Sequence, residues 1–238
     1  MPVLLFMVKN LAVTRKVIVA NSYFCKKGTT ELTDKLNQTL NSLKKGFKDI
    51  PGDRRALLEE LAIYIKGKLL SQKEVNLVFI CTHNSRRSHM AQIWSCAAAY
   101  YYDIQNINTF SGGTLKTAFH PMAVKALQKA GFKIKKLDDK SNPKYRVKID
   151  KKGHPLICYS KRYNHKKNPQ KDFVAVMTCS DADESCPVIP GAEYRTTIKY
   201  DDPKKFDGKP EAEEMYLERS EQIGREMLYV FSKVAGFN

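Results

Sequence analysis

The chain has 238 residues, of which 42% are hydrophobic and 28% charged, a balance typical of globular rather than disordered or fibrous proteins. No apolar run approaches the roughly 20 residues that a membrane-spanning helix needs. The apolar stretch at residues 2–8 has no basic residue ahead of it and matches a signal peptide poorly, so we expect a cytoplasmic protein. Six cysteines are too few for a secreted disulfide scaffold, and we expect chemistry to explain them.

The net charge is +16, and residues 133–171 supply +11 of it, with fourteen Lys and Arg against three acids. A basic surface of this size attracts anions of every kind, from small oxyanions to acidic proteins and nucleic acid. No RNA- or DNA-binding motif accompanies the segment. We therefore expect an anion-attracting face, with a nucleic-acid partner as the weaker alternative.

The first part of the chain is predicted to be helical. Leucines at positions 32, 36, 40 and 43 share one helix face and predict a helix that ends near residue 45. A second helix is predicted after residues 51–53, with Asp53 as its N-cap. We interpret residues 1–74 as an N-terminal helical extension, which most simply packs against the flank of a domain.

From residue 75 onward, predicted strands alternate with predicted helices. Apolar runs predict strands at 75–80, at 107–111, from 132 and at 173–178, and helices are predicted at 88–101, at 121–130 and from 211 to the end. The basic stretch 143–171 contains proline, glycine and short alternating pieces, and we interpret it as a hairpin-like insertion. This order predicts an α/β domain over residues 75–238, with a parallel sheet flanked by helices.

The segment after the first predicted strand carries the chemistry, and it reads Cys81, Thr82, His83, Asn84, Ser85, Arg86, Arg87 and Ser88. Ligands of α/β proteins bind at the carboxyl ends of the strands, where this loop must lie. Its backbone N–H groups and the next helix N-terminus can hold a tetrahedral oxyanion. The same positive end lowers the pKa of Cys81 and favours the nucleophilic thiolate.

The other side chains of the loop fit the same role. Arg87 offers a planar fork of donors for two anion oxygens, Ser88 can hydrogen-bond the thiolate, and Asn84 tolerates unusual backbone angles. Arg86 adds positive charge beside the anion. We therefore expect substrate contacts from Thr82, His83, Asn84, Ser85, Arg86 and Ser88.

This Cys-x5-Arg-Ser loop resembles that of the low-molecular-weight protein tyrosine phosphatase superfamily, and the resemblance covers about residues 75–238. It implies a flavodoxin-like fold. It also implies that Asp202, in the pair Asp202-Pro203, is the general acid that protonates the leaving group. A carboxyl group must hold a proton to act in this way, and burial can raise its pKa enough to do so.

A second motif begins at Cys179 and ends at Cys186-Pro187, and it resembles a segment of thioredoxin-coupled arsenate reductases. The resemblance implies that Cys81, Cys179 and Cys186 act in sequence, that thioredoxin supplies the electrons, and that no cofactor is bound. The alternatives for the cysteine pair are zinc ligands or two buried thiols. Zinc is disfavoured because no histidine pattern accompanies the pair, and we expect no metal.

Three functions are consistent with these motifs. The first is reduction of arsenate to arsenite through the cysteine relay. The second is a low-molecular-weight tyrosine phosphatase that works through a phosphocysteine intermediate, with arsenate replaced by phosphate esters. The third is an inactive anion- or nucleic-acid-binding protein, which the complete set of Cys81, Arg87 and Asp202 disfavours.

Overall fold

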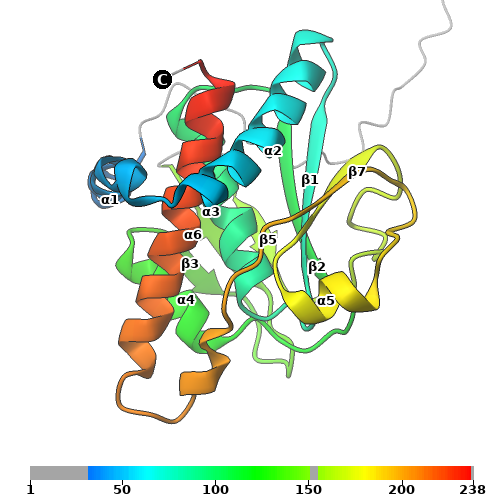
Figure 1. The fold of residues 1–238 in the computed structure, drawn as a ribbon. Helices are drawn as coiled ribbons and strands as arrows, with labels where there is room; N and C mark the ends of the chain where they lie inside the picture. The colour runs from blue at the N-terminus through cyan, green and yellow to red at the C-terminus, as the bar shows by residue number, and fades with distance from the viewer. Residues whose placement is uncertain (1–31, 151–154, 237–238) are drawn as a thin grey trace, which may run out of the picture.

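A computed structural model describes residues 32–150 and 155–236 of the chain (Figure 1). Its centre is a sheet of four parallel strands in the order β2-β1-β6-β7. The strands are β1 (Val75–Cys81), β2 (Ile107–Gly113), β6 (Phe173–Met177) and β7 (Ala192–Thr197). Because β6 and β7 are the third and fourth strands of this sheet along the chain, the order is 2-1-3-4, as in flavodoxin-like folds. The predicted fold class is confirmed.

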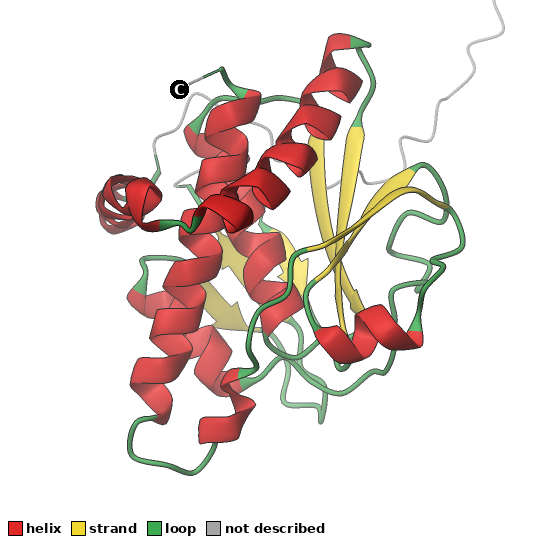
Figure 2. Cartoon of the chain, in the orientation of Figure 1, coloured by secondary structure: helices red, strands yellow, loops and turns green. Residues whose placement is uncertain are grey.

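Helices cover both faces of the sheet (Figure 2). Successive side chains of a strand point to opposite faces, so Leu77 and Phe79 of β1 lie in one core cluster and Val78 and Ile80 lie in the other. The larger cluster packs against α3 (Arg87–Tyr101) and α6 (Ala212–Val234), with α4 (Pro121–Lys129) beside α6. The smaller cluster is covered by the short helix α5 (Ser180–Ser185).

The two predicted N-terminal helices are present as α1 (Asp34–Lys45) and α2 (Gly52–Leu70), joined by the short helix η1 (Gly46–Asp49). Leu36, Leu40, Leu58 and Ile65 are buried in the same cluster as α6, so these helices share the core of the α/β part of the chain. The prediction that Asp53 caps the second helix is wrong. Pro51 is its N-cap, because its extended backbone ends the preceding segment and places Asp53 inside the first turn. Residues 1–31 of the predicted extension lie outside the described residues.

The basic segment forms a second, antiparallel sheet in the order β3-β4-β5. Its strands are β3 (Lys133–Lys136), β4 (Tyr145–Lys148) and β5 (Leu156–Cys158). The predicted hairpin-like insertion 143–171 therefore contains β4 and β5, and the strand predicted from residue 132 joins them rather than the central sheet; residues 151–154 lie outside the described part. Another short helix, η2 (Pro203–Phe206), precedes α6. Within 32–150 and 155–236, no helix is long and apolar enough to cross a bilayer.

Candidate active site

The loop of residues 82–86 joins β1 to α3 at the carboxyl edge of the central sheet (Figure 1). Cys81 is the last residue of β1 and is 3% exposed. Its register partner on β2 is Gly113, where a Cβ atom would lie 2.7 Å from both Asn84 N and Thr82 O. Only glycine lets β2 pass this close to the loop. The backbone of the next residues then closes on the loop, with Thr114 N donating to Cys81 O.

The thiol of Cys81 has a polar neighbour in Ser88. Its Sγ lies 3.1 Å from Ser88 Oγ, and Asn84 Nδ2 donates to the same Ser88 Oγ at 3.0 Å. Since that oxygen accepts from Asn84, the Ser88 hydroxyl proton is available for the sulfur. Asn84 reaches this position with a left-handed φ of 45°, a conformation that asparagine tolerates well. The Cys81 sulfur therefore faces a hydroxyl group in the first turn of α3.

Arg87 joins the loop to the connection between β7 and η2. Its Nη1 donates to Tyr200 O at 3.0 Å and its Nη2 to Asp202 Oδ2 at 2.6 Å. Its Nε is buried and has no hydrogen-bond partner among the described residues. The other carboxylate oxygen of Asp202 accepts from Lys204 N at 3.1 Å and caps η2. The structure thus places Asp202 beside Arg87 as an ion pair.

The side chain of Arg86 makes different contacts from those expected of a substrate ligand. Its Nη2 lies 2.6 Å from Asp207 Oδ2, and its Nε donates to the hydroxyl of Tyr216. Tyr216 in turn donates to Asp207 Oδ1 at 2.6 Å. Burial opposes ionisation of Asp207, but this hydrogen bond and the charge of Arg86 lower the pKa of its carboxyl group. The Arg86 side chain therefore connects the loop to η2 and α6. The backbone N–H group of Arg86 is left to bind the anion.

The second predicted motif lies beside the first. Cys179 directly follows Thr178, whose backbone N donates to Ile80 O at 2.7 Å. Cys81 and Cys179 therefore lie at the carboxyl ends of the adjacent strands β1 and β6. The Sγ of Cys179 lies 3.4 Å from Thr82 Oγ1. Cys179 and Cys81 belong to the same buried cluster, and Cys186 packs against it from the end of α5. All three are free thiols, and Cys186 is the most accessible.

Several residues that hold the loop carry no recognisable sequence motif. His120 N donates to Ser85 O at 2.9 Å, Ser160 Oγ to His83 O at 3.0 Å, and Lys161 N to Asn84 Oδ1 at 2.9 Å. They come from the start of α4 and from the basic segment, so only the tertiary structure brings them here. Across the described parts of the chain, no group of three or more His, Cys, Asp and Glu could hold a metal ion.

The parallel sheet in flavodoxin-like order, with the loop from Cys81 to Ser88 at its carboxyl edge and Arg87 paired with Asp202, defines a flavodoxin-like α/β domain. No protein-family model matches the sequence. Arsenate reductase 2 of Staphylococcus saprophyticus is 32% identical over 127 residues, which are 53% of this chain and 77% of the relative. Arsenate reductase 2 of Staphylococcus epidermidis is 29% identical over 137 residues, 58% of this chain and 82% of the relative.

The chain belongs to the arsenate reductase family, which confirms the resemblance found in the sequence. Among solved structures, the low molecular weight protein tyrosine phosphatase from T. tengcongensis matches with a TM-score of 0.47 and 19% identity, over 67% of this chain and 99% of that chain.

Proposed function

We propose that this protein reduces arsenate to arsenite through successive reactions of Cys81, Cys179 and Cys186. The observation that carries the proposal is the placement of Cys179, which follows the strand next to that of Cys81 and contacts Thr82 of the anion loop at 3.4 Å. A phosphatase needs only Cys81, Arg87 and Asp202. A second buried thiol at the edge of the same loop fits a reaction that ends in a disulfide.

In the first step, the loop N–H groups and Arg87 bind the arsenate oxygens. The buried Nε of Arg87 has no other partner in the described residues, so it is a donor available to the anion. The anion competes with Asp202 for the same guanidinium and turns that carboxyl group toward the substrate. The Cys81 thiolate attacks arsenic(V) and forms an S–As bond. An arsenate hydroxyl takes a proton from Asp202, which picks it up from solvent after the anion has displaced it from Arg87, and leaves as water.

In the second step, the Cys179 thiolate attacks the Sγ of Cys81. An S–S bond forms and the S–As bond breaks, with its electron pair going to arsenic. Arsenic(V) thereby becomes arsenic(III) and leaves as arsenite, while the two cysteine sulfurs are oxidised to a disulfide. The hydroxyl of Thr82, at 3.4 Å from the Cys179 sulfur, can stabilise the attacking thiolate.

The third step requires α5 to change shape. Cys179 and Cys186 flank this six-residue helix as its N-cap and C-cap. Cys186 is seven positions after Cys179, and a helical rise of about 1.5 Å per residue places their Cα atoms about 10 Å apart. A disulfide needs a Cα–Cα distance of about 7 Å or less. The helix must therefore unwind before Cys186 attacks Cys179 and releases Cys81 as a thiolate.

The resulting disulfide of Cys179 and Cys186 must be reduced by an external dithiol, and we propose thioredoxin for this role. Cys186 supports the assignment because it is partly accessible where Cys81 and Cys179 are buried, and exchange requires access to the sulfur. A relay of this kind needs a compartment that keeps thiols reduced, which favours the cytoplasm.

The test is to break the relay at its last thiol. In Cys186→Ser, we expect about one arsenite per enzyme and then no further turnover with thioredoxin, thioredoxin reductase and NADPH. In Cys179→Ser, we expect no arsenite at all. Both variants should hydrolyse an aryl phosphate at the wild-type rate, and Cys81→Ser should abolish both reactions. Wild-type arsenate reduction by both relay variants would overturn the proposal in favour of the phosphatase.

A further inference from the structure

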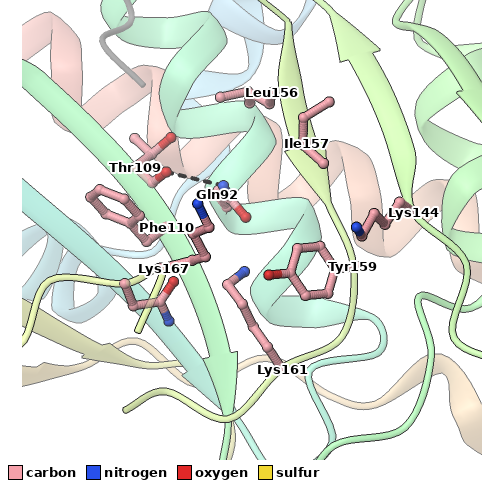
Figure 3. A pocket seen from close by; sticks show the side chains of 10 residues that line it. Gln92, Thr109, Phe110, Lys144, Leu156, Ile157, Tyr159, Lys161 and Lys167 are labelled. Atoms are coloured by element: carbon pink, nitrogen blue, oxygen red, sulfur yellow. Dashed lines mark hydrogen bonds between the residues drawn. The ribbon is translucent and has the colours of Figure 1, made fainter. Parts of the chain in front are cut away.

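A cavity of about 230 Å³ lies between α3, β2 and the basic segment (Figure 3). None of the loop residues 81–88 lines it, so it is separate from the candidate active site. Its polar lining includes Gln92, Lys144, Tyr159, Lys161, Lys167 and Asn168. Three of these side chains are amines and none of the lining residues carries a carboxylate. The cavity therefore has an excess of positive charge.

Lys161 is the buried cation of this cavity. It is 5% exposed and has no carboxylate partner among the described residues. Its Nζ lies 5.1 Å from the centre of the Tyr159 ring, and Nζ of Lys144 lies 5.8 Å from the same centre. Burial lowers the pKa of Lys161 to about 8. A buried ammonium group without a counter-charge is costly, and an anion in the cavity would supply one.

The cavity also offers hydrogen-bond acceptors. Gln92 Oε1 and Asn168 Oδ1 are buried and make no hydrogen bond within the described chain. Their orientation is fixed, because Gln92 Nε2 donates to Thr109 O at 3.0 Å and Asn168 Nδ2 to Ser111 O at 3.0 Å. In Figure 3 the Gln92 oxygen points toward the side of Lys161 and Tyr159. A ligand that pairs with Lys161 and with one of these amide oxygens must carry negative charge and a hydrogen-bond donor.

We propose that this cavity is a second binding site for a protonated tetrahedral oxyanion, the chemical class of hydrogen phosphate and hydrogen arsenate. Its unprotonated oxygens accept from Lys161 and from the exposed amines of Lys144 and Lys167 at the rim. Its O–H group donates to the amide oxygen of Gln92. Sulfate has the same shape and charge but no proton at neutral pH, so it would leave that acceptor unpaired and bind more weakly.

The site is connected to the catalytic loop through the backbone of Lys161. Its N–H donates to Asn84 Oδ1 at 2.9 Å, and its carbonyl accepts from Gly113 N at 2.9 Å. Asn84 donates to Ser88, the partner of the Cys81 thiol. An anion that holds Lys161 in place therefore also stabilises the catalytic loop, through the backbone hydrogen bonds of Lys161. This inference goes beyond the proposed function, because it involves no thiol and no redox step.

The test removes the Arg87 guanidinium from the anion site of the catalytic loop, so that binding to the second site can be measured alone. Isothermal titration of Arg87→Met with inorganic phosphate should show one remaining site, with sulfate bound about tenfold or more weakly and arsenate bound like phosphate. Adding Lys161→Met should abolish this site. Adding Lys166→Met, at an exposed neighbour that does not line the cavity, should leave phosphate binding unchanged.

A second pair of variants covers the case in which Lys161→Met does not fold. Lys144→Met and Lys167→Met alter exposed residues at the rim, and together they should weaken phosphate binding to Arg87→Met by about tenfold. Three outcomes would overturn the proposal: no phosphate bound by Arg87→Met, the same affinity with and without the cavity lysines, or sulfate bound as tightly as phosphate.

Discussion

The three buried cations around the loop are held in different ways. Arg86 pairs with Asp207 and Arg87 pairs with Asp202, and each arginine makes a second hydrogen bond to the connection before α6 or to α6 itself. Among the described residues, Lys161 has its backbone bonds to the loop region and the ring of Tyr159, but no carboxylate partner. Pairing offsets part of the cost of burying the two arginine charges. Lys161 carries its charge at a cost, and that cost depends on pH.

The contribution of Lys161 to stability should therefore rise between about pH 8 and pH 10. Burial lowers the pKa of Lys161 from its ordinary 10.5 to about 8. In this range the unfolded chain binds a proton that the folded chain has released, so increasing pH favours folding. Urea unfolding at pH 7.5 and pH 9.5 measures the effect. Lys161→Met should lack this contribution, and parallel pH dependence in the two proteins would contradict it.

At the scale of elements, α5 is short, and the side chain of Asp183 ties it to β7 and to the residue two positions after that strand. Asp183 accepts hydrogen bonds from Thr197 Oγ1 at 2.7 Å and from Arg195, and Lys199 Nζ lies 3.1 Å from its other oxygen. Burial opposes ionisation of Asp183, but these partners lower the pKa of its carboxyl group. Asp183 and the buried Ala182 hold a helix of only six residues, and so short a helix can unwind locally.

Oxidation should expose the backbone of α5. After one equivalent of arsenate without reductant, amide hydrogen exchange of residues 180–185 should become faster, since the new disulfide cannot form across an intact helix. Cys186→Ser, treated in the same way, keeps the helix and should exchange like the untreated protein. Equal exchange of the wild type before and after arsenate would show that the helix does not unwind.

The N-terminal helix α2 also takes part in the site. Arg54 donates to Glu226 Oε2 from both Nε and Nη2, at 3.0 Å and 2.7 Å, and Nη2 donates to Lys199 O at 3.0 Å. Its guanidinium lies 4.9 Å from the centre of the Tyr200 ring, and Tyr200 O accepts from Arg87. Arg54 thus braces the segment that positions Arg87.

Arg54→Met should impair both stability and activity, and a second variant separates the two. The single change leaves Glu226 buried without its partner, which costs about 3 kcal/mol. In Arg54→Met with Glu226→Leu, no unpaired charge remains and most of that stability should return in urea unfolding. Because the contacts to Lys199 and Tyr200 are still missing, kcat/KM for arsenate should stay about fivefold low. Full recovery of kcat/KM in the double variant would show that Arg54 acts on stability alone.

At the scale of the whole molecule, positive charge dominates the surface. The net charge is +16, and the sheet β3-β4-β5 and the residues after it carry most of the excess beside the anion loop. A field of this sign concentrates oxyanions near the protein before they bind. It acts over the Debye length, which shortens from about 30 Å at 0.01 M salt to about 8 Å at 0.15 M.

Arsenate capture should therefore depend on ionic strength. Raising the sodium chloride concentration from 0.01 M to 0.15 M should lower kcat/KM for arsenate several-fold, because capture of the free anion loses its long-range attraction. The value of kcat should remain constant, because kcat reports the steps after the substrate has bound, and long-range attraction does not affect these steps. A kcat/KM that does not change over this range would rule out steering by the basic surface.

The sequence determined the central features of this protein on its own. The loop from Cys81 to Ser88, the apolar strands that flank it and the helix that follows are all local, because their chemistry and periodicity lie within a few residues. The second cysteine motif could be recognised for the same reason. The joint role of residues in one contiguous segment can therefore be predicted from the sequence alone.

Only the tertiary structure decided which distant residues support that loop. Strand β7 was not predicted, because its half-exposed residues, among them Glu193 and Arg195, become a strand only by pairing with β6. The pairing of Arg86 with Asp207 and the contact of Lys161 with Asn84 join residues 121 and 77 positions apart. Such contacts depend on how the layers pack, and no local pattern encodes them.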